Sequence, residues 1–264
     1  MVYRIDSLDE SAYNPITQKE YDASWVILRL TDSRDYQLLT SSSGYAYCVK
    51  ISRKEHPKWK TAVGDFISFH EGSGCNALLV MSEDVLAAVR SDYAGHSCRD
   101  PFLRQYEPPV LIHSTPLPCY EKILQDQMLK SWNRLQAEGA LSETQPIGAK
   151  LGDPVDFRNY IMFGDGVSSE IVVNSKQIGR IAMDVNAPYQ TGARLYFDAA
   201  KMAADGLLLR DGCHIKVKDA LPLSPYLIFA ATWETIGLEK QLSTPAEFSA
   251  LADEAFSRRF KHAL

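Results

Sequence analysis

Short apolar runs rich in β-forming residues restrict the first hundred residues to a fold built mainly from short strands. Each run either alternates or stays apolar over a length too short for an independent helix. Turn-forming segments such as SSSG (41–44) and GSGC (72–75) separate several of them. A helix is expected only over residues 82–90, where Ser82 is the expected N-cap and two acids fill the first turn. The strands are expected at residues 25–30, 45–51, 65–70 and 77–81.

An aperiodic stretch, residues 91–109, interrupts this pattern and contains Gly95, Pro101 and the pair Pro108–Pro109. Paired prolines end regular structure, because each removes a backbone donor and restricts the residue before it. We therefore predict an α+β protein of two domains. Residues 1–105 form a β-rich N-terminal domain, and residues 106–264 form a second domain.

The second half continues with strands and three helices. Residues 118–138 have apolar side chains at intervals of three and four, which predicts one long helix. A short helix is expected over 198–206. The last helix begins with Thr244 as N-cap, Pro245 at the first position and Glu247 completing a capping box. Strands are expected at residues 110–115, 160–163, 170–173, 179–185, 193–197, 214–218 and 225–233.

Composition narrows the possible functions. The 264 residues carry a net charge of -5, which argues against a broad nucleic-acid-binding surface. No apolar run approaches the roughly 18 residues of a membrane span, and the N-terminus lacks the apolar core of a signal peptide. The five cysteines are widely spaced and form no CxxC pair. We therefore expect reduced thiols, a cytoplasmic location, no membrane partner and no metal site.

His113 is the first candidate site residue, because it ends the apolar strand of the segment LIHST and precedes a loop. A histidine there can reach a ligand, or it can simply hydrogen-bond a loop at the edge of the core. LIHST followed by YEKILQDQMLKSW resembles the opening of the ADP-ribosyltransferase superfamily, including its RNA 2′-phosphotransferase branch. This sequence lacks the glycine that commonly follows the histidine. In such a fold Ser114 and Thr115 are expected beside the cofactor.

Two later segments are similar to parts of the same superfamily. GARLYFDAAKMAADG resembles the strand–helix element of the poly-ADP-ribose polymerase branch. The resemblance makes Tyr196 a stacking tyrosine and Phe197 a cofactor contact, although aromatic residues are ordinary in buried strands. Glu234, in ATWET, would complete a His-Tyr-Glu triad, or it is a solvated carboxylate. Glu170 and Glu239 are alternative acids, and some branches of the superfamily lack this glutamate.

The resemblance implies a split antiparallel sheet with flanking helices in the second domain. It also implies NAD as substrate and transfer of ADP-ribose to a macromolecular acceptor, protein or nucleic acid. Such transfer passes through an oxocarbenium-like ribosyl cation, which a carboxylate stabilises. His113 and Tyr196 should then face one pocket from neighbouring strands, and opposite faces would contradict the transferase interpretation. The alternative is a non-enzymatic interaction protein, such as an inhibitor or immunity protein, in which these residues need not converge.

Overall fold

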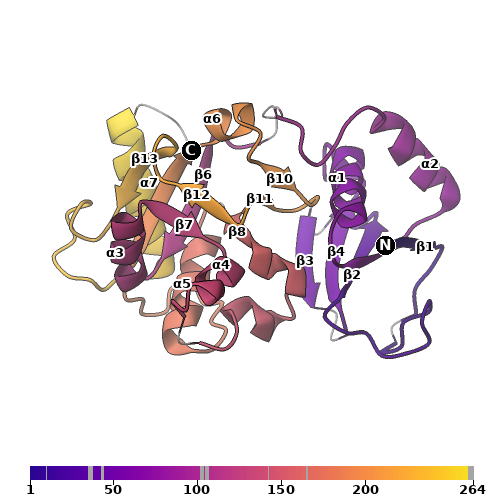
Figure 1. Cartoon of the computed structure of the whole chain (residues 1–264), viewed down its shortest axis with the longest axis horizontal. Coiled ribbons are helices and arrows are strands. Elements are labelled where there is room, and N and C mark those ends of the chain that lie inside the picture. Colours follow the sequence, from indigo (N-terminus) through magenta and orange to yellow (C-terminus); the bar gives the residue numbers. More distant parts are fainter. Residues whose placement is uncertain are drawn as a thin grey trace. The chain divides into compact units, whose positions relative to one another are not determined.

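The computed structural model describes residues 1–9, 11–34, 38–42, 45–101, 104, 107–141, 143–164 and 166–260. Helices and strands are both abundant and the strands form several sheets, which confirms the α+β class. The chain divides into two compact units, coloured by sequence in Figure 1. The first unit comprises Met1–Asp100, Gly148–Arg158 and Leu209–Ile215, and the second comprises the remaining segments. The expected boundary at residues 105 and 106 lies outside the described residues.

The first unit contains a five-stranded sheet in the order β1-β5-β2-β4-β3. All neighbouring strands run parallel except β3, which is antiparallel to β4. The strands expected at residues 25–30, 45–51 and 77–81 are confirmed. The bounds are β1 Val2–Ile5, β2 Trp25–Thr31, β3 Leu38–Ser42, β4 Tyr47–Ser52 and β5 Asn76–Val80.

The expectation of a strand at residues 65–70 is wrong, because they lie inside helix α1, Trp59–Glu71. The longer window explains the error. Buried Ala62 and Val63 are followed four residues later by buried Phe66 and Ile67, a helical spacing that a six-residue window truncates. Helix α2, Glu83–Asp92, begins after Ser82 as expected, although the Ser82 side chain makes no capping hydrogen bond.

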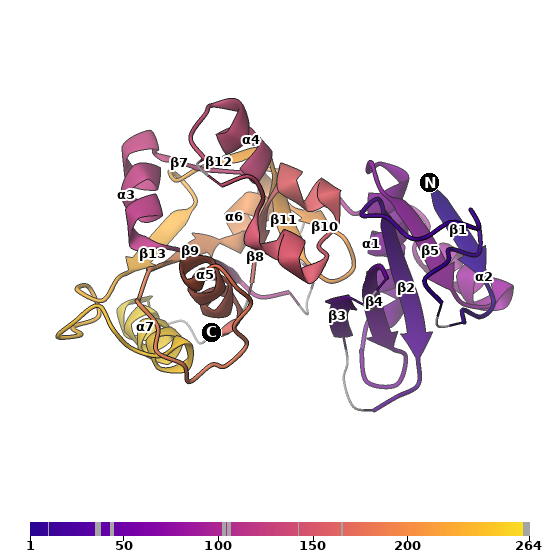
Figure 2. The same cartoon turned by 90° about the horizontal axis from the view of Figure 1, so that it is seen from below.

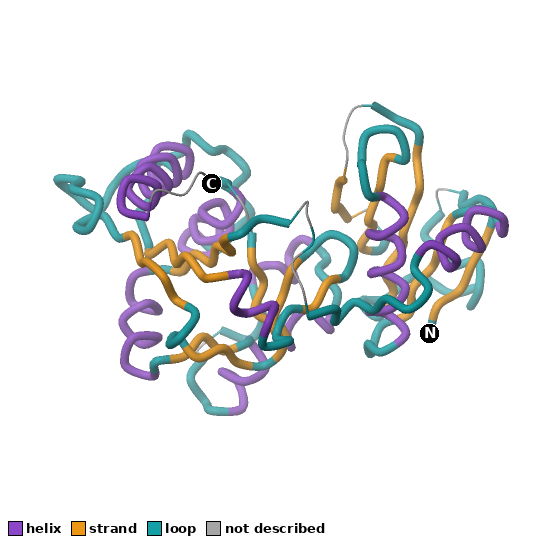
Figure 3. The backbone as a smooth tube through the Cα atoms, turned by 90° about the horizontal axis from the view of Figure 1, so that it is seen from above, coloured by secondary structure: helices purple, strands orange, loops and turns teal. Residues whose placement is uncertain are grey.

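Opposite faces of this sheet pack against different parts of the first unit. One face, which includes Val49 and Leu79, packs against α1 and α2. Figures 2 and 3 view the unit from opposite sides and show both helices on the same side of the strands. The other face, which includes Trp25 and Leu78, packs against the N-terminal segment through Leu8 and Tyr21. Burial on both faces is typical of parallel strands.

Two later segments complete the first unit. The 3-10 helices η1, Ile147–Leu151, and η2, Val155–Asn159, follow the second unit's first elements in the chain, and strand β10 spans Leu209–Arg210. The ring of Phe157 meets the ring of Tyr47 edge-on at 5.4 Å. The backbone N–H of Val155 donates to the carbonyl of Ala23. These contacts join residues far apart in sequence, which a single linear boundary could not anticipate.

The second unit is built around a three-stranded antiparallel sheet, β13-β9-β6, formed by β6 Val110–Thr115, β9 Ala193–Asp198 and β13 Leu227–Ala231. A second antiparallel pair joins β7, Met128–Lys130, to β12, Ala220–Pro222. Strand β8, Tyr160–Phe163, neighbours β11, Ile215–Lys218. The strands expected at residues 110–115, 160–163, 193–197, 214–218 and 225–233 are therefore confirmed, with shifted ends at the last two.

The single long helix expected over residues 118–138 is wrong. The chain instead forms helix α3, Leu117–Asp126, then β7, then helix α4, Trp132–Ala137. The break occurs at Gln127, which adopts a left-handed backbone conformation with φ 54°. Beyond it, buried Leu129 pairs with Leu221 of β12. This tertiary strand pairing overrides a helical pattern that is locally convincing.

The strands expected at residues 170–173 and 179–185 are also wrong. Residues 170–173 belong to helix α5, Ser168–Ile178, whose buried face includes Glu170, Val173 and Asn174 at helical spacing. Residues 179–185 are turn and irregular chain. The helix expected after β9 is confirmed as α6, Ala199–Ala204, where the side chain of Asp198 accepts from the N–H of Lys201.

Helix α7, Pro245–Phe260, is confirmed with its expected cap, since the hydroxyl of Thr244 accepts from the N–H of Glu247 at 3.1 Å. Helices α5 and α7 contact each other and lie side by side in Figure 2. Together they cover one face of the β13-β9-β6 sheet. None of the helices in the described part of the chain has both the length and the hydrophobicity to cross a membrane.

Candidate functional site

His113 is held in a defined orientation near the end of β6. Its Nδ1 lies 3.0 Å from the carbonyl oxygen of Met162 in β8, and its ring meets the ring of Phe163 edge-on at 6.2 Å. A carbonyl oxygen only accepts, so Nδ1 carries the proton in this pair. The neutral imidazole then presents Nε2 as a hydrogen-bond acceptor. The side chain is half-buried, and its orientation is set by the backbone of β8.

The surroundings of His113 favour this neutral form. Burial lowers the pKa of His113, and the nearby ammonium of Lys176 lowers it further, against the opposing effect of the Met162 carbonyl. Lys176 extends from α5, and its Nζ lies 4.0 Å from the Sγ of Cys119 in α3. The site therefore combines a neutral acceptor with a positive charge supplied by a separate helix.

Ser114 and Thr115, expected beside a cofactor, are engaged in the fold itself. The hydroxyl of Ser114 donates to the carboxylate of Glu170 at 2.5 Å. Thr115 is buried and pairs with Ala193. Gly192 passes so close to it that an added Cβ would lie 2.1 Å from the Thr115 carbonyl oxygen. Close backbone packing at this strand end is the physical reason why Thr115 is covered.

Glu170 belongs to a buried network of charged and phenolic side chains. Its carboxylate accepts from Ser114, from the hydroxyl of Tyr189 at 2.5 Å and from the guanidinium of Arg194 at 3.3 Å. Burial raises the pKa of Glu170, and these donors oppose that rise. Arg194 also holds Asp253 of α7 through two nitrogens, at 2.9 and 3.2 Å. The network joins β6, β9, α5 and α7.

Tyr196 lies on the network's face of the sheet, away from His113. Directly opposed residues of an antiparallel pair share a face. His113 opposes Leu195, whereas Tyr196 opposes Ile112, so the side chains of His113 and Tyr196 point to opposite faces. The expectation that they share one pocket is wrong. The reason is the register, which no one-strand pattern specifies.

The packing of Tyr196 is complete without a ligand. Its side chain is fully buried, its hydroxyl donates to Asp253 at 2.7 Å, and its ring stacks on Phe256 at a centroid distance of 4.6 Å. Burial also raises the pKa of Tyr196. A tyrosine enclosed in this way is not available to stack on a nicotinamide ring. Its role in this fold is to fasten α7 to the sheet.

Phe197 shares the face of His113 but is fully buried and meets Phe163 edge-on at 5.6 Å. Phe197 therefore packs against Phe163, whose ring in turn contacts the ring of His113. Glu234 is exposed in the turn that follows β13. Since β13 and β6 lie on either side of β9, their axes are about 10 Å apart. Glu239, the alternative acid, is also exposed.

Three residues around His113 were not anticipated from the sequence: Met162, Phe163 and Lys176. Met162 acts through its backbone carbonyl, which no sequence pattern marks. Lys176 lies in a segment adjoining the stretch assigned to a strand, so its approach to His113 was hidden. Assigning the helical period of residues 168–178 correctly is the signal that would have found it.

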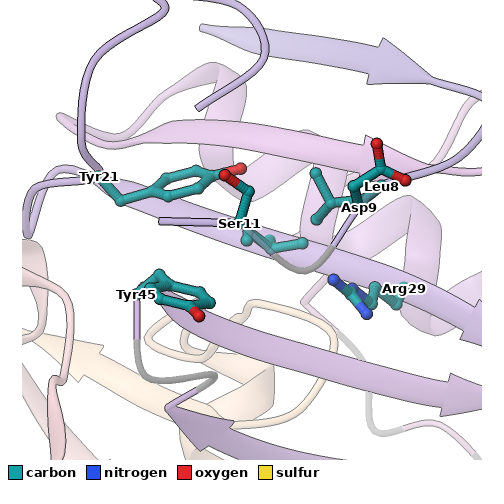
Figure 4. Close-up of a pocket in the computed structure, with 7 residues that line it drawn as sticks. Leu8, Asp9, Ser11, Tyr21, Arg29 and Tyr45 are labelled. Atoms are coloured by element: carbon teal, nitrogen blue, oxygen red, sulfur yellow. The ribbon is translucent and has the colours of Figure 1, made fainter. Parts of the chain in front are cut away.

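The first unit has a small pocket of its own (Figure 4). The hydroxyl of Tyr21 lies buried in this region and has no hydrogen-bond partner among the residues that the structure describes. Burial raises the pKa of Tyr21, and Arg29 lowers it. The pocket is lined by Leu8, Asp9, Ser11, Tyr21, Ile27, Arg29 and Tyr45. Its small size favours an ordered water over a metabolite.

Comparison with known proteins gives no match that would indicate a family. No family model matches it, and neither curated proteins nor solved structures give a match. Functional inference therefore rests on the geometry of the chain's own residues.

Proposed function

We propose that the second unit binds a nucleotide at His113, with NAD as the first candidate. The opposite faces of His113 and Tyr196 contradict the triad form of the transferase interpretation, so transfer of ADP-ribose to a macromolecular acceptor is proposed only in a form that uses neither Tyr196 nor Glu234. One observation carries this proposal: Met162 fixes Nδ1 of His113 as the donor, which leaves Nε2 as an acceptor. A ribose hydroxyl is a donor that fits such an acceptor. The order of elements around His113 supports the resemblance, since α3 follows β6 and α6 follows β9.

The charges near His113 suit a phosphate-bearing ligand. The ammonium of Lys176 is near enough to lower the pKa of His113, and an ammonium binds phosphate as a compact point charge. Ribose and phosphate are adjacent in a nucleotide, so a histidine acceptor and a lysine cation can recognise both groups. This pairing favours a nucleotide over a neutral sugar or a free carboxylic acid.

The transfer step would differ from that of a His-Tyr-Glu triad. When the bond between nicotinamide and ribose breaks, its electron pair leaves with nicotinamide, and the acceptor's nucleophile attacks the ribosyl cation at C1′. Tyr196 is buried on the other face, and Glu234 is exposed in the turn after β13, a strand that does not adjoin β6. The transfer that we propose would therefore resemble that of the superfamily branches that work without the glutamate. His113 would orient the ribose in it.

Calorimetry with NAD and with ADP-ribose tests the binding step. His113→Asn keeps a donor near the position of Nδ1 but removes the acceptor at Nε2. Loss of one hydrogen bond, worth about 0.5–1.5 kcal/mol, predicts roughly 3- to 10-fold weaker binding. Lys176→Met should weaken binding of both ligands through loss of the charge. His96→Asn in the first unit is the control, because His96 is an exposed histidine whose Nδ1 pairs with Asp100 and which lies outside the proposed site.

Labelled NAD tests the transfer step, with proteins and nucleic acids offered as acceptors. Failure of the wild-type protein to bind either NAD or ADP-ribose would overturn the proposal. It would favour the alternative of a non-enzymatic interaction protein. That alternative has its own support in three exposed apolar side chains within residues 172–183: Val172, Ile178 and Met183, exposed by 52%, 46% and 66%.

A further inference from the structure

Three potential metal ligands converge in the first unit, in the turn between β10 and β11. The Sγ of Cys213 lies 3.0 Å from Nδ1 of His214 and 3.3 Å from Oδ1 of Asp211. The same Nδ1 lies 3.2 Å from Oδ2 of Asp211. Among the residues that the structure describes, this is the one group of three or more such side chains whose ligand atoms gather so closely.

The arrangement does not fit a catalytic Cys-His-Asp triad. In a triad the histidine uses one ring nitrogen for the nucleophile and the other for the orienting acid. Here Cys213 and Asp211 both approach Nδ1 of His214. Thiol, imidazole and carboxylate converging on a single point are instead the donors that a cation brings together. Edges of a tetrahedral zinc site measure roughly 3.3–3.6 Å, given bonds of about 2.0–2.3 Å. The observed separations of 3.0, 3.2 and 3.3 Å are slightly shorter and involve both oxygens of Asp211, so a bound cation would spread the three side chains by a few tenths of an ångström.

The turn is held rigidly in this geometry. Oδ1 of Asp211 accepts from the backbone N–H groups of Cys213 and His214, at 3.1 and 2.7 Å. Gly212 has φ +90°, and an added Cβ would lie 2.5 Å from the carbonyl oxygen of Ala62 in α1. No other residue type fits this close approach without displacing α1. The ring of Phe157 packs edge-on against His214 at 5.4 Å.

We propose that Asp211, Cys213 and His214 form a Zn²⁺ site, with the fourth coordination position left to water. The mixed sulfur, nitrogen and oxygen donors suit zinc better than the harder cations Mg²⁺ and Ca²⁺. This proposal is independent of nucleotide binding at His113, and it differs from the expectation, drawn from the spacing of the cysteines and histidines, that the chain has no metal site.

Metal titration of the full-length protein, first treated with a chelator, tests the site. Co²⁺ serves as a spectroscopic probe, because a cobalt–thiolate bond gives charge-transfer absorption. We expect one equivalent of Co²⁺ to bind with this absorption and Zn²⁺ to displace it. Cys213→Ser should abolish the absorption. His214→Ala should weaken binding by at least the roughly 10- to 100-fold that loss of an outer-shell partner costs.

Two matched variants serve as controls. Cys119→Ser removes a half-buried thiol of the second unit, and His96→Ala removes an exposed imidazole, so both should leave Co²⁺ binding unchanged. A second measurement needs no variant: Zn²⁺ should protect Cys213 of the wild-type protein from alkylation, read residue by residue by mass spectrometry. Absence of stoichiometric binding, absorption that survives Cys213→Ser, or alkylation of Cys213 that Zn²⁺ does not slow would each overturn the proposal.

Discussion

The two faces of the β13-β9-β6 sheet use polar side chains in opposite ways. On one face Glu170, Arg194, Tyr196 and Asp253 satisfy one another beneath α5 and α7. On the other face His113 is half-buried, and within the described part of the chain its ring is held by the hydrogen bond of Nδ1 alone. A saturated network stabilises a unique packing, whereas a polarised side chain with one remaining acceptor is equipped for a ligand. Chemical residue type alone therefore does not mark a binding site.

The largest effect that this comparison predicts is on the saturated face. Arg194→Met should lower the free energy of unfolding by about 3–5 kcal/mol, because it leaves the buried Glu170 carboxylate without its cation. Combining it with Glu170→Gln should restore part of the loss, since the buried charge is then absent. Urea denaturation of the two single variants and the double variant measures this coupling. A loss below 1 kcal/mol would mean that the network is not a structural element.

Tyr196→Phe should have a smaller effect, on stability alone. The variant keeps the ring stacked on Phe256 but loses the hydroxyl that donates to Asp253, which predicts a loss of about 1–2 kcal/mol. The affinity for NAD should not change, because Tyr196 lies on the face opposite His113. Urea denaturation and calorimetry together separate the two effects. Weaker NAD binding at unchanged stability would indicate that Tyr196 contributes to NAD binding after all.

The stability that His113 contributes to the fold should depend on pH. The pKa of His113 is lowered in the folded protein, so between that value and the unfolded value of about 6.5 the unfolded chain binds more protons. Stability from this group is complete above pH 6.5 and decreases as the pH falls below it. His113→Asn should reduce that decrease, measured as the difference in unfolding free energy between the two proteins from pH 7.5 to 5. Identical pH profiles would contradict a neutral His113 with a lowered pKa.

The affinity for a nucleotide should depend on the same protonation of His113. Nucleotide affinity should stay constant above pH 6.5 and weaken only when His113 gains a second proton and Nε2 ceases to accept. Calorimetry with ADP-ribose, which lacks the nicotinamide, measures this affinity at pH values above and below 6.5.

The smallest effect is expected at Glu234. Glu234→Gln alters an exposed carboxylate in a turn, so the free energy of unfolding should change by less than about 0.5 kcal/mol. The affinity for NAD should not change either. If labelled NAD shows transfer by the wild-type protein, a loss on the order of 10²-fold in this variant would restore Glu234 as a stabiliser of the ribosyl cation.

Local signals in the sequence specified many elements of this chain. The strands β2, β4, β5, β6, β8 and β9 follow from short apolar runs, and the start of α7 follows from Thr244 and Pro245. The position of His113 near the end of a strand was equally readable. These features depend on residues close together in the chain, where pattern and capping chemistry act directly.

Tertiary structure determined how those elements pair and which side chains they bring together. Pairing of β7 with β12 broke an apparent helix at Gln127. The register of β6 on β9 separated His113 from Tyr196 by turning them to opposite faces. Lys176 lies near His113 on a helix whose first turns suggest a strand, and Phe157 packs against His214 from 57 positions away in the chain. Each outcome depends on contacts between distant segments, which no local window of sequence contains.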